Sequence, residues 1–424
     1  MGTALRLGLR PNLVQFSLLA LDNVFVGMLV GSERTVVPLL GAKSFGITSA
    51  AVLLTFVVAF GVVKGPLNLL AGQLADRYGR RKVLLAGWFF GLPVPWLLLI
   101  APSWGWIVAA NLLLGANQGF AWSMTVTSKV DLVGRRQRGL ALGINEFSGY
   151  VGVAIASAGT GALAADYGLR PAPFVFAAAV AMTGLLLVLA IRETTPFVQL
   201  EQAAAPGGAS PAAASLGSIF ADVSWRNPTM RACSQAGCLN KFGDTGIWVL
   251  LPLAMAAQGH GPAIIGATAG IYAFTWGIAQ LGTGALSDRV GRKPPIVVGL
   301  VLDAAGLALA GVARDGATWF AAATLAGLGT ALVYPVLLAA ISDVAAPVER
   351  GTALGVYRLW RDGGYALGGL TIGIAAAHLN ARGSFSALAV LLLASAMFVQ
   401  RWMRETHNPP RAGPIIDAAV GRRP

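Results

Sequence analysis

The sequence is poor in charge, cysteine and histidine. Only 12% of its 424 residues are charged, against roughly a quarter in soluble domains, while 56% are hydrophobic. This composition excludes an ordinary water-soluble enzyme. Cys233 and Cys238 lie in one apolar segment and are too few for a disulfide framework or a zinc site. We read the three histidines as solvated side chains, so we expect neither a metal nor another cofactor.

The sequence does contain about twelve apolar runs, each long enough to cross a hydrocarbon layer of ~30 Å as a helix. We expect spans near residues 12–40, 48–74, 83–102, 105–129, 139–163, 172–192, 228–257, 263–286, 295–313, 317–343, 352–377 and 383–403. The predicted fold class is an all-α membrane protein with twelve transmembrane helices.

The net charge of +13 reflects membrane topology rather than nucleic-acid binding. Alternate connections between the spans are rich in basic residues, as at 77–82, 135–138 and 289–293. The other connections hold only Lys43, Arg170, Arg314 and Arg382. Because basic loops stay on the cytoplasmic side, we expect both termini in the cytoplasm and the chain in a bacterial inner membrane. The lipid bilayer is thus an expected partner, and nucleic acid is not.

The sequence repeats itself at an offset of 212 residues, which is half the chain. The segment from Gly72 to Arg80 recurs from Gly284 to Arg292, and Asp131 recurs as Asp343. We therefore predict two pseudo-symmetric six-helix bundles, at 1–192 and 228–404. Between them, residues 193–227 form a cytoplasmic linker rich in Ala, Pro, Gly and Ser, and 405–424 form a cytoplasmic tail.

The repeated segment has recognisable chemistry in both copies. We expect Gly72 and Gly284 to let neighbouring helices approach closely, and Gly79 and Gly291 to permit tight turns. With twelve spans in two halves, the two copies resemble the loop motif of the major facilitator superfamily, and this resemblance covers essentially the whole chain. It implies a membrane transporter.

In that superfamily the loop latches the two halves together on the cytoplasmic side. The contacts join the motif aspartate, its arginine and an acidic residue that ends the fourth span. The resemblance implies these gate roles for Gly72, Asp76, Arg77, Gly79, Arg80, Asp131, Asp288, Arg289, Arg292 and Asp343. We add Glu146 and Arg358, because the same offset relates them and both lie ~10 Å from the cytoplasmic end of their spans.

Some features of drug antiporters in the superfamily are missing. Gln118 and Gly119 are present in the fourth span, but Gly115 stands where those antiporters carry an arginine. Their Gly-Pro signature is also absent from residues 139–163. These departures weaken a drug-antiporter assignment and leave the coupling mechanism open.

Twelve ionisable residues fall within the predicted spans. Each would cost roughly 3 kcal/mol if exposed to lipid, so we expect them to face partners or a water-lined cavity between the halves. They are Arg34, Lys64, Lys129, Lys241, Arg358, Arg361, Asp22, Glu33, Glu146, Asp244, Asp303 and Asp362.

Depth along the helices and polar stripes at helical spacing select the residues that we expect to line this cavity. They are Asp22, Lys64, Gln118, Trp122, Tyr272, Trp276, Gln280, Arg361, Asp362 and Tyr365. Hydrogen bonding that only holds the bundle together is the alternative reading of these stripes. Asp22 is the candidate for proton loading, with a static ion pair to a cation such as Lys64 as the alternative.

Two pairs lie nearer the outer mouth, where they are candidates for an outer gate or entry site. They are Glu33 with Arg34, and Lys241 with Asp244. Asp303 receives no role.

The function expected from the sequence is secondary active transport of a small polar or charged solute by alternating access. No G-x-x-x-x-G-K-[ST] loop is present, so an ion gradient, with protons as the coupling ion, replaces ATP. No nucleophile or metal constellation indicates an enzyme. Multidrug efflux of amphipathic compounds and a non-transporting membrane sensor are the alternatives. We expect the monomer to be the functional unit.

Overall fold

The computed structural model describes residues 5–134, 138–203, 215–346 and 349–407, and throughout these ranges the chain forms helices without any strand. Arg135, Arg136 and the tail beyond His407 lie outside the described residues. The helices form two six-span bundles, which confirms the predicted fold class.

The first bundle begins with a short 3₁₀ turn at Arg10–Asn12. Its helices are α1 (Leu13–Lys43), α2 (Ala50–Tyr78), α3 (Arg80–Gly91), α4 (Val94–Ile100), α5 (Trp104–Asn117), α6 (Ser123–Val133), α7 (Arg138–Tyr167) and α8 (Ala172–Ala190). α3 and α4 form one span, which is interrupted where Pro93 and Pro95 remove backbone donors. α5 and α6 form another, joined by a five-residue π-helical stretch, Gln118–Trp122.

The second bundle has the same order of spans. Its helices are α11 (Pro228–Thr245), α12 (Leu251–Ala257), α13 (Pro262–Val290), α14 (Lys293–Val312), α15 (Gly316–Val344), α16 (Arg350–His378) and α17 (Ala381–Trp402). α11 and α12 form one span around a π-helical stretch at Gly246–Leu250.

Nine helices of the described chain are long and apolar enough to cross a membrane. Each of the remaining three spans is either not one continuous helix or not apolar enough to meet this criterion. Two are divided by π-helical stretches, and α16 carries Arg350, Arg358, Arg361 and Asp362.

The linker contains more structure than its composition suggests. It forms α9 (Thr195–Ala203), α10 (Leu216–Ala221) and a π-helical turn at Asp222–Arg226. Val223 is fully buried, and the Trp360 indole donates to the Ser224 hydroxyl at 2.8 Å. The end of the linker therefore packs on α16, which the sequence did not predict.

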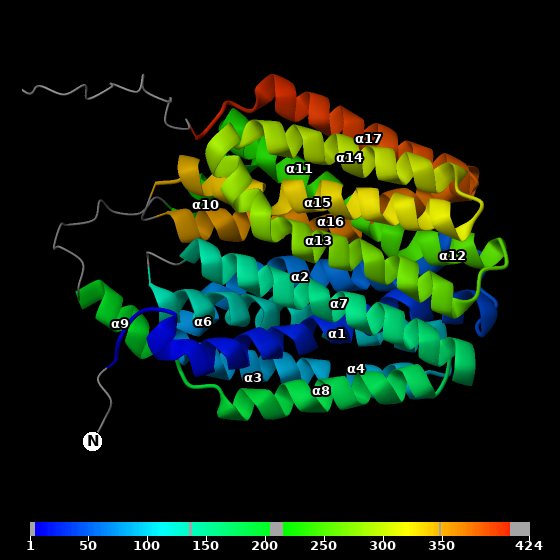
Figure 1. Cartoon of the computed structure of the whole chain (residues 1–424), viewed down its shortest axis with the longest axis horizontal. Coiled ribbons are helices and arrows are strands. Elements are labelled where there is room, and N and C mark those ends of the chain that lie inside the picture. The colour runs from blue at the N-terminus through cyan, green and yellow to red at the C-terminus, as the bar shows by residue number, and fades with distance from the viewer. Residues whose placement is uncertain (1–4, 135–137, 204–214, 347–348, 408–424) are drawn as a thin grey trace, which may run out of the picture.

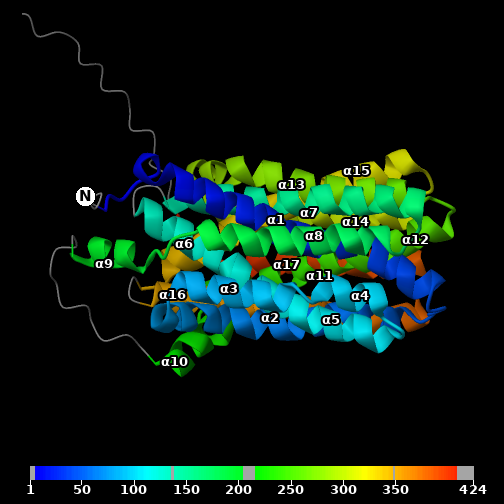
Figure 2. The same cartoon turned by 90° about the horizontal axis from the view of Figure 1, so that it is seen from below.

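All spans run along the long axis of the molecule, with the first bundle below the second in Figure 1. The bundles meet mainly along α2 with α16 and along α7 with α13. We call the end where α2 meets α3 and α13 meets α14 the motif end, and the opposite end the far end. α9 and α10 lie at the motif end in both views (Figures 1 and 2).

At the far end the two bundles are in backbone contact. A Cβ on Gly161 of α7 would lie 2.6 Å from the Pro262 carbonyl oxygen, and one on Gly266 of α13 would lie 2.5 Å from that of Ser157. At the motif end a Cβ on Gly72 or Gly284 would meet nothing within 4 Å. The prediction that these two glycines allow close helix contact is therefore wrong in this conformation.

The turn glycines follow the prediction. Gly79 and Gly291 have φ of 94° and 93°, a conformation that side chains rarely adopt. However, Gly72–Tyr78 belongs to α2 and Gly284–Val290 to α13, so much of the motif is helix rather than loop.

Candidate functional site

An arginine joins two acids in each copy of the motif. Arg80 contacts Asp76 at 2.9 Å and Asp131 at 3.1 Å. In the second copy, Arg292 contacts Asp288 at 2.6 Å and Asp343 at 3.0 Å. The predicted acidic partners at the ends of the fourth and tenth spans are thus in place.

The networks lie within the halves rather than between them. Every contact just described joins residues of one bundle, and Asp76 has a largely exposed carboxylate. Arg77 stacks on Tyr78, with 5.2 Å from the guanidinium carbon to the ring centroid, and Arg289 makes no ion pair among the described residues. The expected latch between halves is therefore not formed in this conformation.

Two glutamates that the sequence analysis left without a role complete these networks. Glu193 accepts hydrogen bonds from the backbone N–H groups of Arg80 and Arg81, both at 3.0 Å, and so caps the start of α3. Glu405 accepts from Arg292 at 2.7 Å and Lys293 at 3.1 Å at the start of α14. The recurrence of Glu193 as Glu405 at the 212-residue offset was the signal that could have found them.

Hydrogen bonding decides the ionisation of both caps. Partial burial alone would raise the pKa of Glu193, but hydrogen bonds from Thr195 and from backbone N–H groups outweigh it and lower that pKa. The pKa of Glu405 is lowered in the same way by the backbone N–H groups it accepts from.

A cavity of about 540 Å³ lies between the halves toward the motif end. α7 contributes Glu146 from the first half, and the second half contributes Gln280, Tyr334 and Arg358. Glu146 accepts from the Trp122 indole at 3.0 Å. Glu146 and Arg358, which were added to the predicted gate, both line this cavity, but they form no ion pair in the described part of the chain.

Residues at equivalent positions of the two halves make equivalent contacts near the centre. Lys64 lies over the Trp122 ring, with 5.7 Å from Nζ to the centroid. At the equivalent positions, Trp276 packs edge-on against Tyr334, with centroids 6.2 Å apart. Tyr150 of the first half links the two groups, because its ring packs edge-on against Trp122 at 5.3 Å and stacks on Trp276 at 3.6 Å. Through Tyr150 the structure connects Lys64, Trp122 and Trp276, which were predicted cavity residues.

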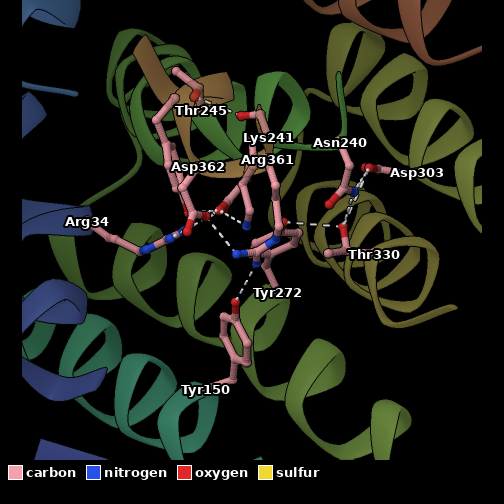
Figure 3. Close-up of polar contacts among 12 residues, drawn as sticks. Arg34, Tyr150, Asn240, Lys241, Thr245, Tyr272, Asp303, Thr330, Arg361 and Asp362 are labelled. Atoms are coloured by element: carbon pink, nitrogen blue, oxygen red, sulfur yellow. Dashed lines mark hydrogen bonds and ion pairs between the residues drawn. The ribbon is translucent and has the colours of Figure 1, made fainter. Parts of the chain in front are cut away.

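A second group of predicted residues connects the halves at the same level. Arg361 pairs with Asp362 at 2.7 Å, and its guanidinium carbon lies 3.7 Å from the Tyr334 ring centroid. It also donates to the Tyr150 hydroxyl of the first half at 3.4 Å (Figure 3). Asn68 of α2 donates to Asp362.

Toward the far end, a buried ion pair crosses between the bundles. Arg34 of α1 contacts Asp244 of α11 at 2.7 Å, and Lys241 contacts the same carboxylate at 3.0 Å. Tyr365 also donates to Asp244. Arg34 and Asp244 are 4% and 0% exposed, so this contact is excluded from solvent.

Other predicted cavity residues lie inside one bundle. Asp22 is fully buried and accepts from the Trp88 indole at 3.0 Å, and the cation that acts on it is Lys129 rather than Lys64. Gln118 donates to the Val26 carbonyl at 2.8 Å. Tyr272 is buried, with its hydroxyl 3.4 Å from Thr330. For these three, the contacts fit the alternative reading of hydrogen bonding within a bundle.

Asp303, which received no role from the sequence, has hydrogen-bond partners inside the second bundle. Its carboxylate accepts from Asn240 of α11 at 2.9 Å and lies 3.5 Å from the Thr330 hydroxyl of α15 (Figure 3). This acid joins three spans of the second bundle. Glu33 plays a similar part in the first bundle, where it accepts from Asn111 at 2.8 Å.

Comparison with known proteins identifies the family. The model of the Major Facilitator Superfamily matches residues 23–238 and 234–419. The chain belongs to this superfamily. It is accordingly a multi-pass membrane protein.

Individual relatives are similar over part of the chain only. The inner membrane transport protein YajR of Escherichia coli (strain K12) is 35% identical over 128 residues, 29% of this chain and 28% of that protein. The multidrug resistance protein MdtH of Enterobacter sp. (strain 638) is 32% identical over 130 residues, 30% of this chain and 32% of that protein. The alignments thus span under a third of each relative.

Solved structures share the fold over nearly the whole chain. A D-xylose-proton symporter superposes with a TM-score of 0.74 at 16% identity, covering 92% of this chain and 98% of that one. The human organic anion transporter MFSD10 gives 0.62 at 20% identity, covering 91% and 98%. At these identities the likeness shows the fold alone.

Proposed function

We propose that the chain is a secondary active transporter, not an enzyme, which moves a small polar or charged solute by alternating access. The observation that carries this proposal is the uneven contact between the halves. At the far end Arg34 and Asp244 join the bundles, whereas toward the motif end a cavity lined by Glu146 and Arg358 separates them. A carrier open to one side at a time has this geometry.

The motif end is the cytoplasmic end in this proposal. The basic connections gather there, and membrane proteins keep such connections in the cytoplasm. α9 and α10 of the linker lie at the same end. Escherichia coli YajR is named an inner membrane transport protein, which supports a bacterial inner membrane for this chain as well. The cavity lies within one chain, so we propose a functional monomer.

Asp22 is the proposed proton site. Its carboxylate is fully buried, one of its oxygens has no hydrogen-bond partner within the described chain, and Lys129 is the cation that acts on it. Such a group binds a proton at low cost when the charge balance around it changes. Lys129 also lacks a hydrogen-bond partner in that part of the chain, where the acids that act on it are Asp22 and Glu146.

Protein reconstituted into liposomes tests the proposed transport function and the proposed proton site. We expect a solute from a metabolite library to drive proton movement into liposomes, read with a pH-sensitive dye. Asp22→Asn should abolish the proton movement and leave solute exchange, whereas Asp166→Asn, at an exposed acid, should change neither. No solute flux from the library would contradict the transporter proposal. If transport by Asp22→Asn keeps the wild-type dependence on the pH gradient, Asp22 is not the proton site.

Multidrug efflux is the second candidate function. The MdtH relatives and the aromatic rings of Trp122, Trp276 and Tyr334 near the cavity favour it. Altered drug resistance on deletion or overexpression of the gene would support efflux over uptake of a polar solute.

A further inference from the structure

Cations outnumber acids where the two halves meet. Among the described residues, its four acids are Glu146, Asp244, Asp288 and Asp362. Its six cations are Arg34, Lys64, Lys241, Arg292, Arg358 and Arg361. The other buried acids, Asp22, Glu33 and Asp303, accept hydrogen bonds from residues of their own bundle.

The acids of the interface are mostly occupied. Asp244 accepts from Arg34, Lys241 and Tyr365, and Asp362 accepts from Arg361 and Asn68. Asp288 pairs with Arg292 and is largely exposed. Of the buried carboxylate oxygens here, a single one, on Glu146, lacks a donor among the described residues. A cationic ligand would therefore find one free buried acceptor.

Two of the cations, in contrast, have no acid partner in the described chain. Lys64 makes neither an ion pair nor a hydrogen bond there, and its ammonium lies 5.3 to 5.7 Å from the ring centroids of Phe60, Trp122 and Tyr365. Arg358 lines the cavity, also without an ion pair. An ammonium among aromatic rings retains three N–H donors for a ligand.

Lys64 and Arg358 stand on opposite sides of one helix contact. A Cβ on Gly65 of α2 would lie 3.3 Å from the Leu359 carbonyl oxygen of α16, so the two helices pack closely at this level. Much of the remaining wall of the cavity is apolar, with Leu142, Ile144, Leu281 and Leu338, while Gln280, Ser342, Asp288 and Arg292 add polar groups. The cavity therefore offers Arg358 and hydrocarbon. Lys64 lies at the α2–α16 contact rather than on the wall.

We propose that the solute is an amphipathic organic anion, a carboxylate on a mainly apolar body. Arg358 meets the carboxylate in the cavity, and Lys64 binds it at the centre, while the leucines contact the body. This inference rests on the proposed transport function and names the substrate class of that same site.

Thermal unfolding of the full-length purified chain tests which ligand charge the site prefers. The three probes share a phenylbutyl group and differ in the charge of their end group. They are 4-phenylbutyrate, 4-phenylbutanamide and 4-phenylbutylammonium. We expect the carboxylate alone to raise Tm. Lys64→Gln should weaken its apparent affinity at least tenfold and Lys64→Arg should restore part of it. Lys82→Gln, which removes an exposed lysine of α3, should not alter it.

Each contrary result has a distinct meaning. If the ammonium or the amide raises Tm and the carboxylate does not, the proposal that the solute is an anion fails. It also fails if no probe raises Tm. If Lys64→Gln unfolds without ligand near the wild-type Tm and binds the carboxylate equally well, Lys64 is not the anchor and the proposal fails. Binding of the carboxylate without its flux in liposomes would overturn the transport function and leave the ligand class standing.

Discussion

Asp244 is the residue on which closure of the far end depends most. It accepts from Arg34 of the other bundle and from Lys241, and all three side chains are buried. Removing its charge would leave two cations in a desolvated site without an acid. Breaking a buried pair in this way typically costs about 3 to 5 kcal/mol.

We therefore expect Asp244→Asn to lower Tm strongly and to reduce transport. Asp166→Asn, which removes an exposed carboxylate from α7, is the matched control and should leave both unchanged. An unchanged Tm in Asp244→Asn would show that the ion pair does not hold the far end closed.

Depth predicted some neighbours correctly and others not. Glu146 and Arg358, which were grouped by their offset and similar depth, line the same cavity. Asp22 and Lys64 were grouped because they lie at similar depth, yet Asp22 faces the interior of the first bundle and Lys64 faces the other half. A sequence gives height along a helix, but the direction in which a side chain points depends on packing between helices.

At the scale of elements, α3 and α14 begin in the same way. A glycine with positive φ ends the preceding helix, and Glu193 or Glu405 then accepts from the first backbone N–H groups. These carboxylates satisfy donors that a helix start leaves free and lie at the positive end of its dipole. Such a cap typically contributes about 1 kcal/mol.

The stability supplied by these caps should depend on pH. Because their folded pKa values are lowered, their contribution is present above the unfolded value of about 4.3 and is lost as pH falls through the folded pKa. We expect the difference in Tm between wild type and Glu193→Gln/Glu405→Gln to be largest near neutral pH and to shrink in acid. A difference that does not change with pH would contradict capping by the ionised form.

The spans themselves were predictable because hydropathy and turn residues mark them. The span predicted at 228–257 has the observed bounds, and others extend a few residues farther at the motif end. The π-helical stretches at Gln118–Trp122 and Gly246–Leu250 were not predicted. They carry no proline, and inserted turns of this kind depend on what neighbouring helices pack against them.

For the whole molecule, the glycines at the α7–α13 contact set which end is closed. A Cβ at position 266 would lie 2.5 Å from a backbone oxygen of α7. We expect Gly266→Val to separate the bundles at the far end and shift the population toward conformations open there. Transport should fall because the closed end no longer forms.

Labelling measures that shift. A cysteine at Ala154, which is 8% exposed on α7, should react faster with an impermeant maleimide in Gly266→Val, in a background with Cys233 and Cys238 replaced by alanine. Gly282→Val on the same helix, at an exposed position with open space around its Cβ, should not change the rate. Equal rates in the two variants would contradict the role of this contact.

The arrangement of Lys64 has a consequence for how often the carrier turns over. Its ammonium belongs to one bundle, and the other bundle presents the Arg361–Asp362 pair, in which Asp362 attracts the ammonium and Arg361 opposes it. These three side chains together carry one positive charge in excess. Closing the bundles around that excess charge, in a medium that screens it poorly, costs free energy. A bound anion neutralises the excess, so we expect an empty carrier to reorient slowly and a loaded one to reorient faster.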